Sequence, residues 1–433
     1  MKQSEPLVLS NLSARRVHLH VSAIIRDLIM AVLLVWLVCP YQAFFQNWVL
    51  YGVLWILWWG FALLSNMSAV KSALLNPFSL GCFIWPLTLC FLSFFNWAEF
   101  SVYQFTIPFI LISFSYYAKG NYCDSLKFFL VVYFIYAILI NFHSISQLWI
   151  NPNTSRILAN SDQSVTIYYA GPFMANFSYI NNLPALSILL VYGIKHNFFN
   201  TKSKIFFFAV LLINCYLLIL AEYMIAMLMF VVFLLYVLLI QGENKSNSKL
   251  RLIICILLIP FVLVLTSPIL KWIAELIGEG RIAERLSSIG EFLGSGSVGE
   301  GSDFQKRWLR YQRSLISIAD HPIFGVGRTE YMAGGLVGGH SEILDNFAYY
   351  GLFFGSLFVV YLINAYKNAK RFLRERFLAI YRILFLIYFL NCLVNAAYTE
   401  EMLIVTFFVL PSMLFVCQKG SEERELSGCR EQS

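Results

Sequence analysis

The sequence predicts an all-α polytopic membrane protein, with about twelve transmembrane helices and one large outer loop that contains amphipathic helices. Three observations lead to this prediction. Of the 433 residues, 59% are hydrophobic and only 13% are charged, whereas soluble domains carry about 25% charged residues. Apolar runs of about 17 to 25 residues recur along the chain, and each is long enough to cross about 30 Å of hydrocarbon. Finally, the basic residues between these runs are confined to alternate connections.

Each apolar run is interpreted as one spanning helix. The first run follows a polar, basic stretch and lacks an Ala-x-Ala cleavage pattern, so we expect a retained helix and not a removed signal peptide. In chain order the predicted spans lie at about 22–39, 43–65, 79–96, 101–117, 125–146, 176–194, 205–219, 222–240, 250–270, 346–366, 376–396 and 401–417.

The basic residues predict the orientation, because Lys and Arg in short loops are retained on the cytoplasmic side. The alternate short connections at 40–42, 96–100, around 222 and at 398–401 contain neither residue, so we expect them outside. Twelve spans in this phase place both termini in the cytoplasm. The connections expected inside hold Arg15, Arg16, Lys71, Lys119, Lys195, Lys202, Lys204, Lys245, Lys249, Lys367, Lys370, Arg371 and Arg374.

The chain therefore divides into three parts. Residues 1–270 hold nine spans and a smaller outer loop at about 147–175, residues 271–345 form the large outer loop, and residues 346–433 hold three spans and a cytoplasmic tail. The spans are almost free of charge, with Arg26 and Arg382 close enough to the cytoplasmic edge to snorkel. We expect a lipid-substrate flippase to carry charges inside the bundle, so this distribution argues against one.

The large outer loop contains a predicted amphipathic helix at 303–319. Lys306, Arg310 and Arg313 share one side, with Arg307 at its edge. An apolar face on the membrane or on the bundle would point these cations into a shared space, where guanidinium groups suit phosphate. A second interpretation is an interfacial helix that touches lipid phosphates and does no chemistry. The apolar side holds Phe304, Trp308, Tyr311, Leu315, Ile318 and Ala319.

A second group of polar residues, His340, Glu342 and Asp345, lies where this loop re-enters the membrane. Positive charge near a histidine favours the neutral imidazole, which can accept a proton. Structural roles stay open, since a lone histidine is more often structural and Asp345 can cap the next helix. Weaker candidates for a base are the outer acids Glu222, Glu400 and Glu401.

The pattern of metal-ligating residues indicates no metal site. The outer loops contain no Asp-x-Asp pair and no His or Cys cluster with ligand spacing. The nine cysteines are scattered, mostly within the spans or on the cytoplasmic side, so we expect neither a disulfide framework nor a zinc knuckle. Arginines would then have to neutralise any phosphate.

Two motifs in the outer loop resemble those of the O-antigen polymerase and ligase superfamily, bacterial membrane enzymes that handle glycans on undecaprenyl diphosphate. The first is an arginine-led helix from Arg307 that ends in His-Pro-Ile-Phe-Gly-Val-Gly at 321–327. The second is Gly-His-Ser-Glu-Ile-Leu-Asp-Asn at 339–346, followed by Tyr-Gly-Leu-Phe-Phe-Gly at 350–355. Together they cover about fifty residues. His340 in a Gly-His-Ser motif with Asp345 is more similar to polymerases than to ligases.

Two further features bear on this resemblance. Polymerases of this kind tend to show an arginine and a glycine with ten residues between them, and Arg285 with Gly296 and Arg328 with Gly339 fit that spacing. The family's Ser-Arg pair near the outer end of the span at 222–240 is replaced by Ala-Glu-Tyr at 221–223. Arg156 or Arg281 would have to replace that phosphate contact.

The resemblance implies a GT-C-like, metal-independent glycosyltransferase without a cofactor, multi-pass in the bacterial cytoplasmic (inner) membrane with both termini cytoplasmic. It would be an O-antigen polymerase that moves a growing glycan from undecaprenyl diphosphate onto the next lipid-linked repeat unit. The alternatives are a ligase that uses lipid A core as acceptor and, less favoured, a flippase. Expected partners are the lipid-linked oligosaccharide, membrane lipids and a chain-length regulator, with no nucleic acid. The implied catalytic residues are His340, Glu342 and Arg307, and those for the diphosphate are Arg281, Arg285, Arg307, Arg310 and Arg313.

Overall fold

A computed structural model of the chain describes residues 5–39, 47–151, 154, 173–240, single positions and short pieces between 271 and 291, and residues 303–328 and 335–430. Within these ranges every regular element is a helix. The all-α class predicted from the sequence is therefore confirmed. The predicted span at 250–270 and most of the loop at 147–175 lie outside the described residues.

Most helices overlap the predicted spans, although the first begins at Glu5, the last ends at Arg430 and the predicted span at 79–96 is divided into two short helices. Eight helices in the described part of the chain are long and apolar enough to cross a membrane, so the chain is a multi-pass membrane protein, while the count of twelve stays a prediction. The helices are α1 (Glu5–Val38), α2 (Trp48–Leu74), α3 (Pro77–Gly81), α4 (Ile84–Ser93), η2 (Val102–Thr106), α5 (Ile107–Lys119), α6 (Cys123–Ile150), α9 (Phe177–Lys195), α10 (Thr201–Ala221), α11 (Met224–Leu235), η3 (Tyr236–Ile240), α14 (Asp303–Asp320), α15 (Glu342–Lys370), α16 (Glu375–Val394), α17 (Glu400–Ile404), η5 (Val405–Val409) and α18 (Leu410–Arg430).

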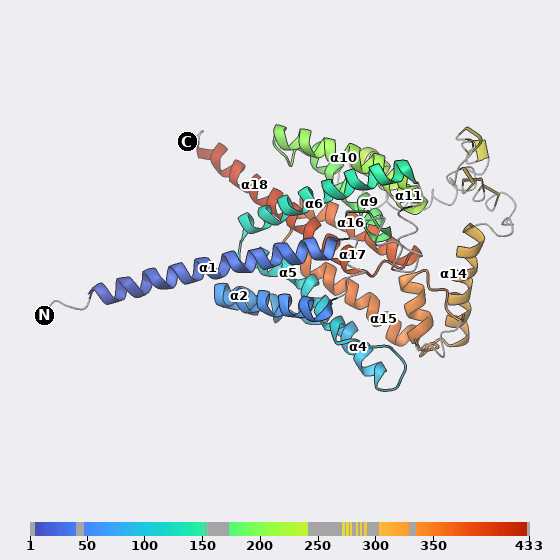
Figure 1. Ribbon diagram of the computed structural model, residues 1–433, viewed down its shortest axis with the longest axis horizontal. Helices are drawn as coiled ribbons and strands as arrows, with labels where there is room; N and C mark the ends of the chain where they lie inside the picture. The colour runs from blue at the N-terminus through green and yellow to red at the C-terminus, as the bar shows by residue number, and fades with distance from the viewer. Residues whose placement is uncertain are drawn as a thin grey trace.

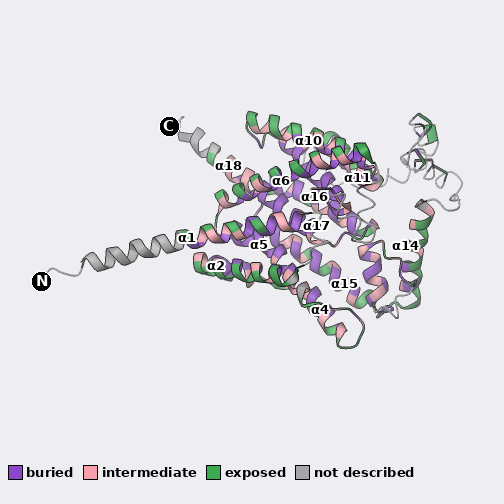
Figure 2. Ribbon diagram, viewed as in Figure 1, coloured by how far each residue is buried: buried purple, intermediate pink, exposed green. Residues whose placement is uncertain are grey.

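The spanning helices form one bundle, and the ends of the bundle differ (Figure 1). The start of α1 and the end of α18 project from one end, whereas α14 lies across the opposite end. Buried residues line the faces where helices meet, and exposed apolar residues cover the outward faces of helices such as α2 and α10 (Figure 2). This is the pattern expected where lipid surrounds the bundle. Helix α14 therefore lies at the end of the bundle that is opposite the two termini.

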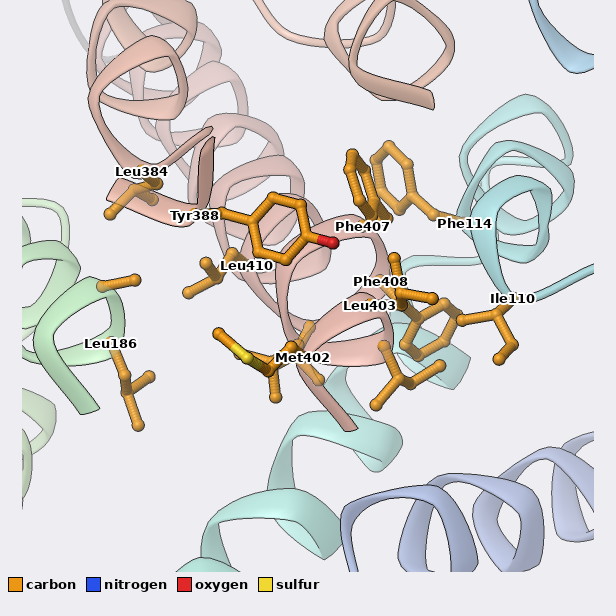
Figure 3. Packing of buried hydrophobic residues seen from close by; sticks show 14 of the residues in the cluster. Ile110, Phe114, Leu186, Leu384, Tyr388, Met402, Leu403, Phe407, Phe408 and Leu410 are labelled. Carbon is orange, nitrogen blue, oxygen red and sulfur yellow. The ribbon is translucent and has the colours of Figure 1, made fainter. Parts of the chain in front are cut away.

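The centre of the bundle is the segment formed by α17, the π-helix η5 and α18. Its apolar side chains, among them Met402, Phe407 and Phe408, are almost completely buried. Figure 3 shows them packed against Tyr388 of α16 and Phe114 of α5. A helix that is apolar all round must be enclosed by other helices or by lipid, and here other helices enclose it.

Arg26 corrects one expectation, because its guanidinium does not snorkel to the cytoplasmic edge. The residue is only 1% exposed. Its Nη1 atom donates to the Tyr116 hydroxyl at 2.8 Å and its Nε atom to Asp27 at 2.7 Å. Its charge also lies 4.4 Å from the centre of the Tyr122 ring. An ion partner and aromatic faces together offset the cost of burying the charge. Arg382 keeps an exposed side chain and pairs with Glu375.

Candidate functional site

The loop after α14 enters a break in α15. The break is at Gly351, whose φ of 69° no helix interior adopts. The amide groups just beyond it leave the helix, because the Leu352 N–H donates to the Pro322 carbonyl at 2.7 Å and the Phe353 N–H to the Ile323 carbonyl at 3.3 Å. The loop at 321–328 thus supplies the carbonyl acceptors that the preceding turn of α15 would have supplied in a continuous helix.

The same loop donates hydrogen bonds to the carbonyl groups of α15 that lose their helical partners at the break. The Val326 N–H donates to the Ala348 carbonyl at 3.0 Å, and the Gly327 N–H donates to the Tyr349 carbonyl at 2.8 Å. A side chain at Gly325 would meet the backbone of α15, so the loop needs a glycine at that position. The Gly-Val-Gly segment at 325–327 and the glycine at 351 therefore belong to one structure, in which the loop is inserted into the break of α15. We call this insertion the interlock.

Small polar contacts hold helix α14 across the end of the bundle opposite the two termini (Figure 1). The Ser314 hydroxyl donates to the Asp345 carboxylate at 2.5 Å and accepts from the Gly338 N–H at 3.0 Å. The Tyr311 hydroxyl donates to the Val394 carbonyl, at the end of α16, at 2.6 Å. A side chain at Gly338 would strike the backbone of Arg310, so the close approach depends on this glycine. The helix begins and ends within one residue of the predicted limits.

The predicted apolar face of α14 is not the face that contacts the bundle. Ser314 and Ser317 are buried there. Of the predicted apolar set, Tyr311 and Ile318 are partly buried near them, while Leu315 is 48% exposed. The reason is the short distance between the backbones, which only small side chains on the contact face allow. Arg307 and Arg310, which lie next to this face, are therefore close to the start of α15.

Asp345 ties α14 to α15 and also closes the start of α15. Ser341 is the N-cap, since its hydroxyl accepts from the Leu344 N–H at 3.1 Å. The Asp345 carboxylate accepts in turn from the Ser341 N–H at 2.9 Å, while its other oxygen binds Ser314. Both carboxylate oxygens are thus occupied. The capping role considered from the sequence is present, and the bond to α14 is added to it.

His340 lies directly before this cap, beside two arginines of α14. Burial, followed by the charges of Arg307 and Arg310, lowers the pKa of His340 from its ordinary 6.5 to about 4. The imidazole is therefore neutral at pH 7. Its Nε2 atom is buried without a hydrogen-bond partner among the described residues, and the ring lies 6.0 Å from that of Tyr311. This nitrogen is suited to accept a hydrogen bond from a bound hydroxyl.

Glu342 belongs to a neighbouring cluster that lies deeper in the bundle. Its carboxylate accepts from the Asn346 side chain at 3.1 Å, and its backbone N–H donates to the Asn395 carbonyl at 3.0 Å. Its positively charged neighbour is Arg328. None of the described contacts of Glu342 is with His340. His340 and Glu342, which we expected to act together, are therefore close in the chain but belong to different polar groups in the structure.

The predicted arginines separate into three sets. Arg307 and Arg310 lie close enough to His340 to act on its charge. Arg313 is exposed on the same helix and is not among the charges that act on His340. Arg281, Arg285 and Arg156 lie outside the described residues.

Arg328 is the residue that the sequence argument undervalued. Its guanidinium lies 5.5 Å from the centre of the Tyr349 ring. Burial alone would lower its pKa, but the neighbouring Tyr350, Glu342 and Tyr349 outweigh this and raise the pKa. The sequence signals for Arg328 were its spacing from Gly339 and its position after the Gly-Val-Gly motif, and neither predicts its acidic and aromatic neighbours, which come from α15.

The site offers two guanidinium groups and a neutral imidazole on one side, and a mixed acidic and basic cluster on the other. Among the described residues, no group of three or more His, Cys, Asp or Glu side chains is placed to hold a metal ion. Comparison with known proteins found no family model that matches the chain and no curated protein that matches it.

Proposed function

We propose that the protein is a metal-independent glycosyltransferase, an O-antigen polymerase that moves a growing glycan from undecaprenyl diphosphate onto the next lipid-linked repeat unit. The observation that carries this proposal is the position of His340. Its buried Nε2 atom, which has no hydrogen-bond partner among the described residues, lies beside Arg307 and Arg310 at the end of a membrane-spanning bundle. A lipid-linked diphosphate presents its charge at that level of the membrane.

In the proposed reaction, the acceptor hydroxyl oxygen forms a bond to the anomeric carbon of the donor glycan. The bond from that carbon to the diphosphate breaks, and its electron pair leaves with the diphosphate oxygen. Arg307 and Arg310 stabilise the departing charge by paired hydrogen bonds. The hydroxyl proton passes to Nε2 of His340. Direct displacement inverts the configuration at the sugar carbon.

The two arginines also link donor binding to the strength of the base. In the free protein their charges lower the pKa of His340 to about 4, which makes its imidazole a weak base. A bound diphosphate neutralises those charges and therefore raises the basicity of the ring. His340 is therefore a stronger proton acceptor when the donor is in place than in the free protein.

The remaining predicted residues take supporting roles. Arg313 is exposed on α14 and is placed to meet the lipid-linked diphosphate on its way to the site. Arg281 and Arg285 stay proposed auxiliaries. Glu342 organises the outer ends of α15 and α16 through Asn346 and Asn395. The proposed location is the bacterial cytoplasmic (inner) membrane, with α14 on the periplasmic side and both termini in the cytoplasm.

The test is a gel of surface polysaccharide from cells that lack the gene and carry wild-type, Arg307→Ala or His340→Ala protein. Wild type should restore a ladder of chain lengths. Both variants should stay in the membrane and give core with a single repeat unit. Arg382→Ala, which removes an exposed guanidinium from α16, should restore the ladder fully.

Other outcomes would change the assignment. If a variant gave normal chain lengths, the role assigned to that residue would be wrong. Uncapped core together with long lipid-linked polymer would identify a ligase with lipid A core as acceptor. A flippase would instead leave its lipid-linked repeat unit on the cytoplasmic side, where a membrane-impermeant probe on the outer face does not reach it.

A further inference from the structure

We infer that a subsite for the acceptor sugar lies beside the diphosphate-binding arginines, formed by Trp97, Glu99, Arg328 and Tyr349. This inference rests on the proposed function and names the part of the site that binds the sugar. The four residues come from the connection after α4, from the loop after α14 and from the start of α15. They meet only because the loop at 321–328 is inserted into α15.

The loop that carries Arg328 is fixed from the other side by Trp97. The Arg328 N–H donates to the Trp97 carbonyl at 2.8 Å. The indole Nε1–H of Trp97 donates to the Phe324 carbonyl at 3.0 Å. A left-handed turn at Asn96, with a φ of 54°, starts the connection that brings Trp97 to this position. Two hydrogen bonds therefore hold the backbone of Arg328 in register with Trp97.

The side chain of Arg328 is held on one side and open on the other. Its guanidinium lies against Tyr349 at 5.5 Å, with Glu342 as an acidic neighbour on the bundle side. The residue as a whole remains exposed. Part of its fork of N–H donors is thus left for a ligand. The exposed Glu99 lies two residues after Trp97 in the same connection, and its charge acts on Tyr349, so it supplies a hydrogen-bond acceptor on the Trp97 side of the loop.

This combination suits a neutral sugar better than a diphosphate. Aromatic side chains such as Trp97 and Tyr349 offer apolar faces to the C–H face of a sugar ring. A carboxylate and a guanidinium can together accept from and donate to neighbouring hydroxyl groups. The carboxylates of Glu99 and Glu342 would repel a diphosphate, whereas Arg307 and Arg310 would attract one. Charge therefore divides the outer end of the bundle into a donor side and an acceptor side.

The experiment uses the full chain in lipid nanodiscs, with lipid-linked glycan as donor and the soluble repeat-unit oligosaccharide, freed from its lipid, as acceptor. Glu99→Gln and Arg328→Met should each raise the KM for the acceptor about tenfold, which is the effect of losing about 1.4 kcal/mol of binding. The KM for the donor should not change. Glu99 is exposed, so its variant should fold even if Arg328→Met does not. The matched control is Glu375→Gln with Arg382→Met, an exposed pair on α16.

Binding is also measured without turnover, by saturation-transfer NMR of the soluble repeat unit with each protein. A signal with wild type that is lost in Glu99→Gln supports the subsite whether or not the protein polymerises. Equal signals and equal acceptor KM values in wild type and Glu99→Gln would overturn the inference while leaving the proposed function intact. A further outcome would also overturn the inference. If Arg328→Met weakened the binding of inorganic diphosphate as much as Arg307→Met does, Arg328 would belong to the donor side.

Discussion

Replacing Arg310 with glutamine is expected to move the acid limb of the pH–rate profile to higher pH. Arg310 is one of two arginines whose charge, after burial, lowers the pKa of His340. Below that pKa the imidazole carries a proton and cannot accept one from the acceptor hydroxyl, so activity falls as the pH falls through it. Removing a nearby positive charge favours the protonated ring and raises the pKa. The variant should therefore lose activity at a higher pH than wild type.

The size of the effect follows from the two limiting pKa values of His340. With the pKa of about 4 found in the folded protein, about 97% of the rings are neutral at pH 5.5. With the ordinary pKa of 6.5, about 9% would be neutral at the same pH. Burial is the largest cause and remains in the variant, as does the charge of Arg307. The neutral fraction should therefore fall only part of the way between these limits.

The assay is the initial rate of glycan lengthening by protein in nanodiscs, expressed as kcat/KM for the donor between about pH 3 and pH 8, because this ratio reports the free protein. Arg313→Gln is the control, since it removes the same charge from the same helix without being among the charges that act on His340. Its acid limb should match that of wild type. A wild-type limb near 6.5, or an Arg310→Gln limb that coincides with wild type, would refute the proposed electrostatic coupling.

Three further predictions concern the supports of the site and of the bundle. Ser314→Ala leaves a buried carboxylate oxygen and a backbone N–H without their partner, so it should lower the free energy of unfolding by about 2 to 4 kcal/mol, measured by thermal unfolding in detergent; Ser356→Ala should change it little. Gly351→Ala should destabilise the protein by several kcal/mol and release α14 to proteolysis, because it combines a positive φ with a backbone clash; an unchanged cleavage pattern would contradict the interlock. Arg26→Met should cost about 3 to 5 kcal/mol, because it removes the cation from beside the Asp27 carboxylate, and the double variant with Asp27→Asn should cost less; equal losses would mean that the two charges do not interact.

Much of the fold could be predicted because the membrane allows few alternatives. A long apolar segment in lipid must satisfy its own backbone hydrogen bonds, so it becomes a helix wherever it lies in the chain. The described helices accordingly overlap the predicted spans, although α1 begins earlier and α18 ends later than predicted, and α14 keeps its predicted limits. These properties depend on local composition and periodicity. The sequence also predicted basic residues near His340 because one loop carries both, but the docking of α14 beside the start of α15 is what brings Arg307 and Arg310 to it.

The tertiary structure decided which distant segments meet. The sequence of α14 shows a broad apolar face, yet Ser314 makes the contact because only a small side chain lets the helix approach Gly338 and Asp345. Gly351 sits within a continuous apolar run, and only the inserted loop, which replaces two helical hydrogen bonds, explains the break there. Arg328 contacts Trp97 although more than half the chain separates them in sequence, and hydrophobic periodicity does not predict such a contact. A backbone group must find some partner, but which distant partner it finds depends on how whole helices pack.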